Sequence, residues 1–447
     1  MHPDRAVFFF SLMSRNSFVF PGSKIYLPIP RPLESQWHAD CVSFRSSQAT
    51  ESWLVPRKEI EMSIALQIIF WVAAALVAYA YVGYPLVVFA CSRLFGHNRR
   101  AVDCAEEDLP TISLLIAAHN EGSVIAERVD NALAMDYPKD KLQIIVASDG
   151  SQDGTNAIVE SYADRGVRLL AFPQQRGKSA VLNDAVAQLD SELMILSDAN
   201  TMMEPQAARR LVRWFSDTKV GAVCGWLQLY DTRTGRNADG LYWRYENFLK
   251  SCEGRLDAVL GANGAIYAMR TELFQPIPAD TLVDDLTIPL LAKLSSGCRI
   301  VYDREAVAVE ETAPDIRAEF RRRARIGAGG FQAIARLWQL LHPRHGWTTF
   351  AFLSHKILRW SSPFFLVAML LSSLLLATMP VYGLLLLAQV AFYALALCGD
   401  RLAVAGNGGR LLRLPALFTT VNAALLVGFA RWLRGPQTGV WNRTARA

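Results

Sequence analysis

At 447 residues the chain exceeds one ordinary domain, and we expect about two to three parts. Hydrophobic residues make up 52% of it and the mean hydropathy is +0.17, which is high for a soluble protein and predicts membrane-spanning segments. The net charge of +5 comes with arginines clustered beside those segments, which indicates a cytoplasmic membrane face and anionic substrates rather than nucleic acid. The seven cysteines form no Cys-x-x-Cys pair, which excludes an evident disulfide framework or zinc site.

The chain begins with a stretch that has no steady periodicity, followed by a long apolar run. We expect residues 1–61 to be a disordered N-terminal arm, or an upstream extension from a misassigned start codon. Residues 62–95 carry no charge before Arg93, which predicts a transmembrane helix. Arg93, Arg99 and Arg100 follow the run, so the positive-inside rule places its C-terminal end in the cytosol.

Residues 109–312 alternate between strand and helix patterns. Apolar runs predict strands at residues 111–117, 141–148, 167–172 and 192–196, with helices between them at 124–135, 156–164 and 179–189. This alternation predicts an α/β domain with a mostly parallel, Rossmann-like sheet. The second half is less regular, with strands predicted at 220–229, 262–269 and 299–302 and helices at 241–252 and 286–294.

The segment 144–155, IIVASDGSQDGT, joins a buried-strand pattern to a polar turn. Its two Asp-Gly pairs, at 149–150 and 153–154, predict a tight turn directly after the strand. Polar clusters also follow the strands that end near residues 117 and 196. Because ligands of parallel α/β sheets bind at the carboxyl ends of strands, we expect these clusters to share one functional edge.

From residue 313 the chain turns amphipathic and then apolar. Residues 313–359 predict amphipathic helices at a membrane interface, and residues 360–434 predict about two to three transmembrane helices. A third span would place the arginine-bearing tail, residues 435–447, outside the cell, against the charge rule. Either the third segment is re-entrant or interfacial, or the tail is an exception to that rule.

Acids near the strand ends suit chemistry on an anionic substrate. A nucleotide diphosphate needs a divalent cation held by oxygen ligands. Asp198 is the best candidate, Asn200 is a weaker partner, and Lys178 or Arg176 is placed to meet phosphate oxygens. Sugar transfer with inversion needs one carboxylate base, and Asp285 or Asp284 qualifies. The plainer interpretation is structural, with Asp198 in a loop and the two adjacent acids capping a helix.

Arg322 and Arg325 lie one helical turn apart on one face of a predicted helix at residues 319–326. The two guanidinium groups suit bidentate contacts that neutralise a leaving diphosphate. The alternative is a basic amphipathic helix that lies on anionic lipid.

Six motifs, in this order, resemble those of the membrane-bound family 2 glycosyltransferases: AAHNE at 117–121, SDGSQDGT at 148–155, RGKSAVLN at 176–183, SDAN at 197–200, GANGA at 261–265 and VDD at 283–285. The resemblance runs from about residue 109 to the C-terminus, and the flanking apolar segments look like those of cellulose and hyaluronan synthases. It implies a GT-A-type sheet flanked by transmembrane helices and an inverting transfer from a nucleotide-sugar donor.

The resemblance also implies a role for each matching position. The nucleotide-sugar would contact Glu121, Asp149, Lys178, Asp198, Arg322 and Arg325; the metal, Mg²⁺ or Mn²⁺, would be held by Asp198 and Asn200; the acceptor would face Gly261, Ala262, Asn263 and Gly264; and the catalytic base would be Asp285, beside Asp284.

Two positions depart from the family pattern. Asn200 replaces the second acid of the family's Asp-x-Asp, so metal binding would lean on Asp198 and the donor phosphates. Processive members carry Gln-x-x-Arg-Trp, whereas Arg322 and Ile326 stand here at the Gln and Trp positions. The missing tryptophan argues against processive synthesis.

The sequence therefore predicts a membrane-embedded inverting glycosyltransferase that moves a sugar from a nucleotide-diphosphate donor, with a UDP-sugar expected, to a lipid-linked or polysaccharide acceptor. The expected partners are donor, acceptor and membrane lipid, with no nucleic acid. The expected location is the plasma membrane, or the inner membrane of a bacterium, with several spans and a cytoplasmic catalytic domain. The alternatives are a processive synthase that also translocates its polymer, and an inactive nucleotide-sugar-binding scaffold.

Overall fold

The computed structural model describes residues 57–231, 236–237, 241–311, 316–402 and 409–435. Most of the predicted N-terminal arm and nearly all of the predicted tail lie outside these ranges. A helix already begins at Arg57, so residues 57–61 of the predicted arm belong to the first helix, with Glu59 in its first turn, where an acid complements the helix dipole.

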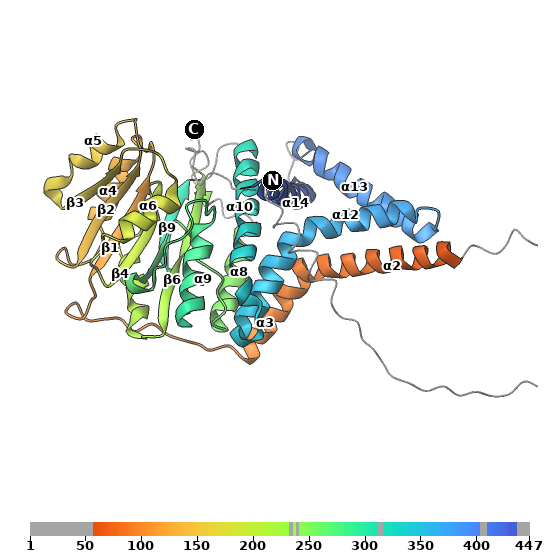
Figure 1. The fold of residues 1–447 in the computed structure, drawn as a ribbon, viewed down its shortest axis with the longest axis horizontal. Helices are drawn as coiled ribbons and strands as arrows, with labels where there is room; N and C mark the ends of the chain where they lie inside the picture. The colour runs from red at the N-terminus through yellow and green to blue at the C-terminus, as the bar shows by residue number, and fades with distance from the viewer. Residues whose placement is uncertain (1–56, 232–235, 238–240, 312–315, 403–408, 436–447) are drawn as a thin grey trace, which may run out of the picture. The chain divides into compact units, whose positions relative to one another are not determined.

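A nine-stranded sheet forms the centre of the domain (Figure 1). The strand order is β3-β2-β1-β4-β8-β6-β9-β5, and β7 pairs with β6. The strands are β1 (Ile112–Ala118), β2 (Leu142–Asp149), β3 (Val167–Phe172), β4 (Leu193–Asp198), β5 (Thr201–Met203), β6 (Val220–Asp231), β7 (Arg236–Asn237), β8 (Tyr267–Arg270) and β9 (Arg299–Glu311). β1 to β4 pair in parallel, as do β6 and β9, whereas β8 runs antiparallel to both of its neighbours.

Helices cover both faces of the sheet, and for this reason every residue of β1 is buried. Alternate side chains enter two cores: Leu115 and Ala117 join one, and Leu114 and Ile116 join the other. The first core includes residues of α6 (Lys178–Val186), α8 (Leu241–Arg255) and α9 (Asp284–Ser296), and the second includes residues of α4 (Ile125–Leu133), α5 (Thr155–Glu160) and α7 (Ala207–Val212).

Two strand predictions are corrected by the structure. The strand predicted at 262–269 is only Tyr267–Arg270, because residues 261–265 form a loop that starts at Gly261, whose φ is +79°. The strand predicted at 299–302 extends to Glu311. Its charged middle is accommodated because Asp303 accepts hydrogen bonds from Arg213 Nη2 at 2.8 Å and Trp214 Nε1 at 2.7 Å.

Within the described ranges, four helical segments are long and apolar enough to cross a membrane: Lys58–Leu94, Trp347–Leu375, Pro380–Leu397 and Leu414–Leu433. The helices in or beside them are α2 (Arg57–Ala78), α3 (Tyr84–Leu94), α10 (Ile316–Arg336), α11 (Trp347–Ala351), α12 (Arg359–Leu375), α13 (Pro380–Leu402) and α14 (Gly409–Leu433), with π-helical turns η1 (Tyr79–Gly83) and η7 (Phe352–Leu358). α2 and α12 lie side by side (Figure 1).

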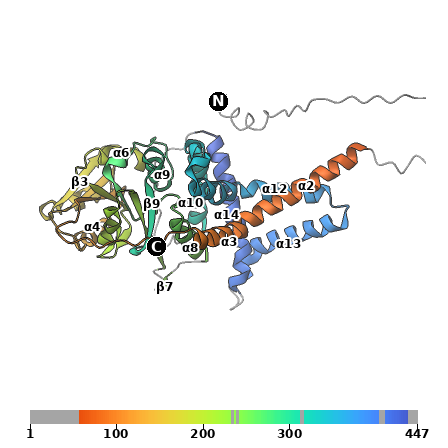
Figure 2. The same cartoon turned by 90° about the horizontal axis from the view of Figure 1, so that it is seen from below.

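The arginine-bearing helix α10 packs tightly against α14 (Figure 2). A Cβ added at Gly428 of α14 would lie 2.7 Å from the carbonyl oxygen of Ala324 on α10. Any side chain at Gly428 would therefore push the two helices apart.

Short 3₁₀ turns complete the fold: η2 (Ala163–Arg165), η3 (Arg213–Ser216), η4 (Thr271–Leu273), η5 (Trp338–Leu341) and η6 (Pro343–His345).

A buried polar bridge joins α8 to the apolar helices. Glu253 of α8 accepts a hydrogen bond from the hydroxyl of Tyr84 on α3 at 2.7 Å and lies 2.6 Å from Nδ1 of His355 in η7. Glu246, two turns earlier on α8, forms an ion pair with Arg359 of α12. All five side chains are buried, so the bridge fixes α8 to three segments that lie far from it in the sequence.

Replacing Glu246 by Gln is expected to lower the free energy of unfolding by about 3–5 kcal/mol, because the buried guanidinium of Arg359 loses its charged partner. Thermal unfolding of the detergent-purified protein measures the change. Glu160→Gln, at an exposed position on α5, is the matched control and should leave the midpoint unchanged. Equal midpoints for the two variants would contradict this account.

Candidate active site

Three charged side chains from separate elements meet beside the carboxyl end of β4. Asp198 ends β4, Lys178 begins α6 and Asp284 begins α9. The Lys178 Nζ lies 2.7 Å from Asp198 Oδ1 and 3.3 Å from Asp284 Oδ2. Burial alone would lower the pKa of Lys178, but the charges of Asp198 and Asp284 outweigh it and hold that pKa above its ordinary value. The lysine is therefore a fixed positive charge between two carboxylates.

Asp285, the next residue on α9, lies against the loop that precedes β8. Its Oδ2 accepts a hydrogen bond from the Gly264 N–H at 3.3 Å, and its backbone oxygen accepts one from the Ala262 N–H at 2.8 Å. A Cβ at Gly261 would lie 2.8 Å from the Cα of Leu286, so only glycine permits this approach. The structure thus brings the predicted acceptor stretch and the predicted base together.

The pKa of Asp285 is raised above its ordinary value. Burial is the main cause, and the neighbouring charge of Asp284 adds to it. Lys178 and Lys250 act in the opposite direction, because their positive charges favour the ionised carboxylate. A carboxylate with a raised pKa is a stronger proton acceptor than an exposed one, as a general base requires.

Asp149 is fully buried and its carboxylate is bound by the protein's own backbone. Oδ1 accepts a hydrogen bond from the Arg176 N–H at 2.7 Å, and Oδ2 accepts one from the Gly177 N–H at 2.8 Å. These are the two residues before Lys178. The structure therefore shows Asp149 holding the turn that presents Lys178, and the contact of Asp149 with a nucleoside stays a prediction.

Glu121 lies in the loop after β1, next to the turn after β2. Its backbone N–H donates to Thr155 Oγ1 at 2.9 Å, and the following N–H, of Gly122, donates to Asp153 Oδ2 at 2.9 Å. The loops that carry Glu121 and Asp149 are thus tied together at the ends of adjacent parallel strands. The predicted convergence of these two polar clusters is seen in the structure.

The remaining predicted residues lie at the border of this group. Asn200 donates from Nδ2 to Glu310 Oε1 at 2.7 Å. Arg322 of α10 pairs with Glu319 at 2.8 Å on its own helix, and the side chain of Arg325 is exposed. Neither arginine is joined to Asp198 or Asp285 by a contact that the structure describes.

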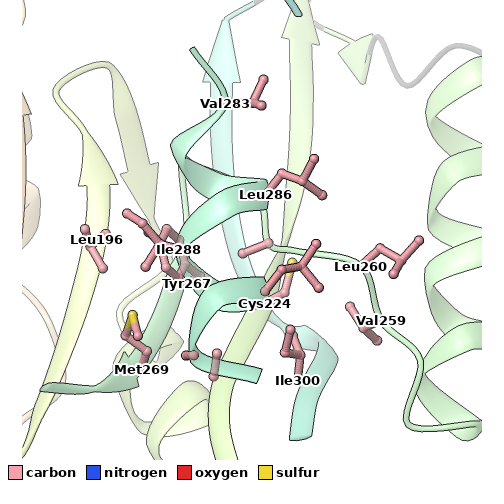
Figure 3. Packing of buried hydrophobic residues seen from close by; sticks show 14 of the residues in the cluster. Leu196, Cys224, Val259, Leu260, Tyr267, Met269, Val283, Leu286, Ile288 and Ile300 are labelled. Atoms are coloured by element: carbon pink, nitrogen blue, oxygen red, sulfur yellow. The ribbon is translucent and has the colours of Figure 1, made fainter. Parts of the chain in front are cut away.

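Three polar residues near the site escaped the sequence analysis: Lys250, Tyr267 and Glu310. The hydroxyl of Tyr267 is fully buried and, among the described residues, has no hydrogen-bond partner. Its ring packs beneath the start of α9, near Leu286 and Ile288 (Figure 3). Burial and then the charges of Asp284, Asp285 and Asp198 raise its pKa well above the ordinary value, so it stays a protonated donor. An apolar strand pattern gives no signal of such a group.

Comparison with known proteins agrees with this geometry. Residues 113–275 match the profile of "Glycosyl transferase family 2". The chain contains a family 2 glycosyltransferase domain. It is 35% identical over 125 residues to the "Probable glycosyltransferase YdaM" of Bacillus subtilis, covering 27% of this chain and 30% of that protein. It is 25% identical over 272 residues to the "Poly-beta-1,6-N-acetyl-D-glucosamine synthase" of Staphylococcus aureus, covering 58% of this chain and 63% of that one.

The chain thus spans less than two thirds of the length of these relatives. Among solved structures, the mannosyltransferase PcManGT from Pyrobaculum calidifontis, in complex with GDP-Man and Mn²⁺, matches with a TM-score of 0.63 at 22% identity, over 82% of this chain and 99% of that one. The predicted resemblance and the predicted GT-A-type fold are confirmed.

The glycosyltransferase domain offers oxygen ligands for a metal at the end of β4. Among the described residues no group of three or more His, Cys, Asp or Glu side chains forms a metal site. Asp198 is bound to Lys178 on one oxygen, and Asn200 keeps its amide oxygen because its nitrogen faces Glu310. This set fits a hard divalent ion that also takes ligands from donor phosphates, as Mg²⁺ does.

Replacing Asp149 by Ala in this domain is expected to destabilise the loop before α6, because two backbone N–H groups lose their charged acceptor. Each such loss costs about 1–3 kcal/mol. Hydrogen exchange of the 174–178 segment should speed up, and the midpoint of thermal unfolding should fall. Unchanged exchange there would show that Asp149 does not hold this turn; Asp190→Ala, at a site that neither contacts it nor lines the cluster, is the control.

Proposed function

We propose that this chain is a membrane-embedded inverting glycosyltransferase of extracellular or cell-surface polysaccharide synthesis. It would transfer a sugar from a nucleotide-diphosphate donor, with a UDP-sugar the first choice, to a lipid-linked or polysaccharide acceptor. The observation that carries the proposal is the meeting of Lys178, Asp198 and Asp284 beside Asp285. This group combines charges for a diphosphate with a half-buried carboxylate that faces a backbone-lined loop.

The chemistry follows from those positions. The carboxylate of Asp285 accepts the proton of the acceptor hydroxyl, whose oxygen attacks the anomeric carbon of the donor sugar. The bond from that carbon to the diphosphate breaks on the opposite side, so the configuration inverts and the nucleoside diphosphate leaves. Lys178 supplies positive charge for the departing phosphates, and Arg322 and Arg325 are the further candidates for this task.

Asp198 and Asn200 would hold Mg²⁺ or Mn²⁺ together with the donor phosphates. The metal would supply positive charge that stabilises the diphosphate as it leaves. The Pyrobaculum calidifontis mannosyltransferase, a protein of similar fold, was solved with GDP-Man and Mn²⁺, which is consistent with this assignment. The four long apolar helices support a multi-pass protein of the plasma membrane, the inner membrane in a bacterium, with the catalytic domain in the cytoplasm.

A processive synthase is the second candidate, and the Staphylococcus aureus relative favours it by its name. Ile326, at the position of the processive tryptophan, favours a single transfer. Product length separates the two, since one added sugar and a long polymer differ in mass. An inactive scaffold would bind the donor without releasing nucleoside diphosphate.

The decisive experiment incubates the detergent-purified protein with a panel of nucleotide sugars and Mn²⁺ and measures nucleoside diphosphate release. We expect release from one donor above all others, at a rate that falls when EDTA removes the metal. Absence of release from every donor, with and without membrane lipid extract as acceptor, would overturn the proposed function.

A further inference from the structure

Lys250 of α8 is a buried lysine beside the candidate site with no role assigned so far. Its side chain is 9% exposed, and among the described residues no carboxylate lies within salt-bridge distance of it. Its Nζ donates a hydrogen bond to Asn263 Oδ1, lies 3.8 Å from Cys224 Sγ and lies 5.9 Å from the centre of the Tyr302 ring. Burying an ammonium group without a paired carboxylate costs free energy. The hydrogen bond to Asn263 is the closest polar contact that offsets this cost.

The contact fixes the orientation of Asn263. An ammonium only donates hydrogen bonds, so Lys250 requires the amide oxygen. The amide nitrogen, on the other side, donates to the backbone oxygen of Gly225 at 2.7 Å. With both ends bound, the side chain of Asn263 has one arrangement, and it links α8 to β6 through the loop that carries it.

That loop is the one that touches Asp285. The residues on either side of Asn263 supply both backbone contacts: the Gly264 N–H donates to Asp285 Oδ2 at 3.3 Å, and the Ala262 N–H donates to its backbone oxygen at 2.8 Å. A shift of Asn263 would therefore displace both neighbouring N–H groups, one of which binds the carboxylate of Asp285 and the other its backbone oxygen.

We propose that Lys250 is a positioning residue: its ammonium, through Asn263, holds the 261–264 loop against Asp285 and so sets where an acceptor hydroxyl meets the base. The effect on sugar transfer rests on the proposed function, whereas the contact between Lys250 and the loop does not depend on it. Lys250 also lowers the pKa of Asp285, against burial and the charge of Asp284, which agrees with a location close to the base.

The first test is hydrogen–deuterium exchange on the full chain in detergent. Lys250→Met is expected to speed exchange in peptides covering residues 261–266, because Asn263 loses its bond to the ammonium. Asn263→Ala should produce the same change and serves as the second variant if Lys250→Met folds poorly. The control is Lys293→Met: Lys293 is also 9% exposed, but it donates to the backbone oxygen of Asp257 at 2.9 Å.

The second test separates positioning from general stability. In steady-state transfer, Lys250→Met is expected to raise the KM for acceptor and lower kcat, together by about 10-fold or more, with the Kd for donor unchanged within about twofold. Because both variants remove the Lys250–Asn263 contact, the double variant Lys250→Met/Asn263→Ala should be no worse than the poorer single variant. Multiplicative losses, or exchange that rises equally in Lys293→Met, would overturn the proposal.

The two experiments distinguish failure of the proposed function from failure of the positioning role of Lys250. A wild-type protein that releases no nucleoside diphosphate from any donor refutes the glycosyltransferase activity, while the exchange of peptide 261–266 still decides whether Lys250 holds the loop. An active wild type with unchanged exchange and unchanged acceptor KM in Lys250→Met refutes the positioning role alone.

Discussion

Asp285→Asn is expected to reduce sugar transfer by about 10²- to 10⁴-fold, the contribution of a general base, while the Kd for donor stays near the wild-type value. The amide has nearly the same shape as the carboxylate and can still accept from the Gly264 N–H, but it cannot take a proton from the acceptor. Nucleoside diphosphate release measures transfer, and titration with donor measures binding.

Asp217→Asn is the matched control for this variant, because Asp217 pairs with Arg299 at 2.6 Å before the amino ends of β6 and β9, away from the catalytic edge. It should retain full transfer activity. Wild-type turnover by Asp285→Asn would remove Asp285 from the mechanism.

The pH dependence of the wild type follows from the same carboxylate. Because its pKa is raised above the 3.8 of an isolated aspartate, kcat/KM should fall on acidification through a pKa higher than 3.8, as the base becomes protonated. The free energy of unfolding depends on pH in the opposite direction to activity. The native state binds the Asp285 proton more tightly than the unfolded state does, so the contribution of Asp285 to stability decreases as pH rises from about 3.8 through its raised pKa.

Lys178→Met is the second variant with a large expected effect. It leaves Asp198 and Asp284 facing each other without their shared cation, and truncating one partner of a buried charge pair costs about 2–5 kcal/mol in binding. The Kd for donor should therefore rise by about 30-fold or more. The acid limb of kcat/KM should also move to higher pH, because the positive charge of Lys178 lowers the pKa of Asp285.

Lys178→Arg keeps the charge at this position and should preserve more of the donor affinity than Lys178→Met. Thermal unfolding of both variants shows whether either has lost its fold. A folded Lys178→Met protein with unaltered donor affinity would show that Lys178 serves only to balance the two acids.

The parallel half of the sheet could be predicted from sequence because burial on both faces produces continuous apolar runs. The strand predicted at 167–172 matches β3 residue for residue, and the strand predicted at 192–196 differs from β4 by one or two residues at each end. The meeting of Lys178 and Asp198 could be anticipated for a related reason: polar residues that follow parallel strands, here β3 and β4, gather at one edge of the sheet. Asp284 comes after the antiparallel strand β8, so this rule does not place it there.

The missed features depend on contacts between distant segments. β9 continues past Asp303 to pair with β6 and β5, and Arg213 and Trp214, ninety and eighty-nine residues earlier in the chain, bind the Asp303 carboxylate. Lys250 lies within a predicted helix whose pattern says nothing of Asn263. Tyr267 resembles any other residue of an apolar strand until the fold places the acids of α9 above it. Periodicity reports burial, but it does not report which polar group a buried side chain meets.

The buried bridge of Glu246 and Glu253 to Tyr84, His355 and Arg359 has a practical consequence for anyone who wishes to trim this protein. Cutting away the apolar helices would remove Arg359, His355 and the Tyr84 hydroxyl, which are the polar partners of two buried acids on α8, and would expose those acids without them. Because the same helix carries Lys250, the damage would extend toward the loop beside Asp285. A water-soluble fragment is therefore the wrong starting point for biochemistry on this protein, and the full set of helices should be retained.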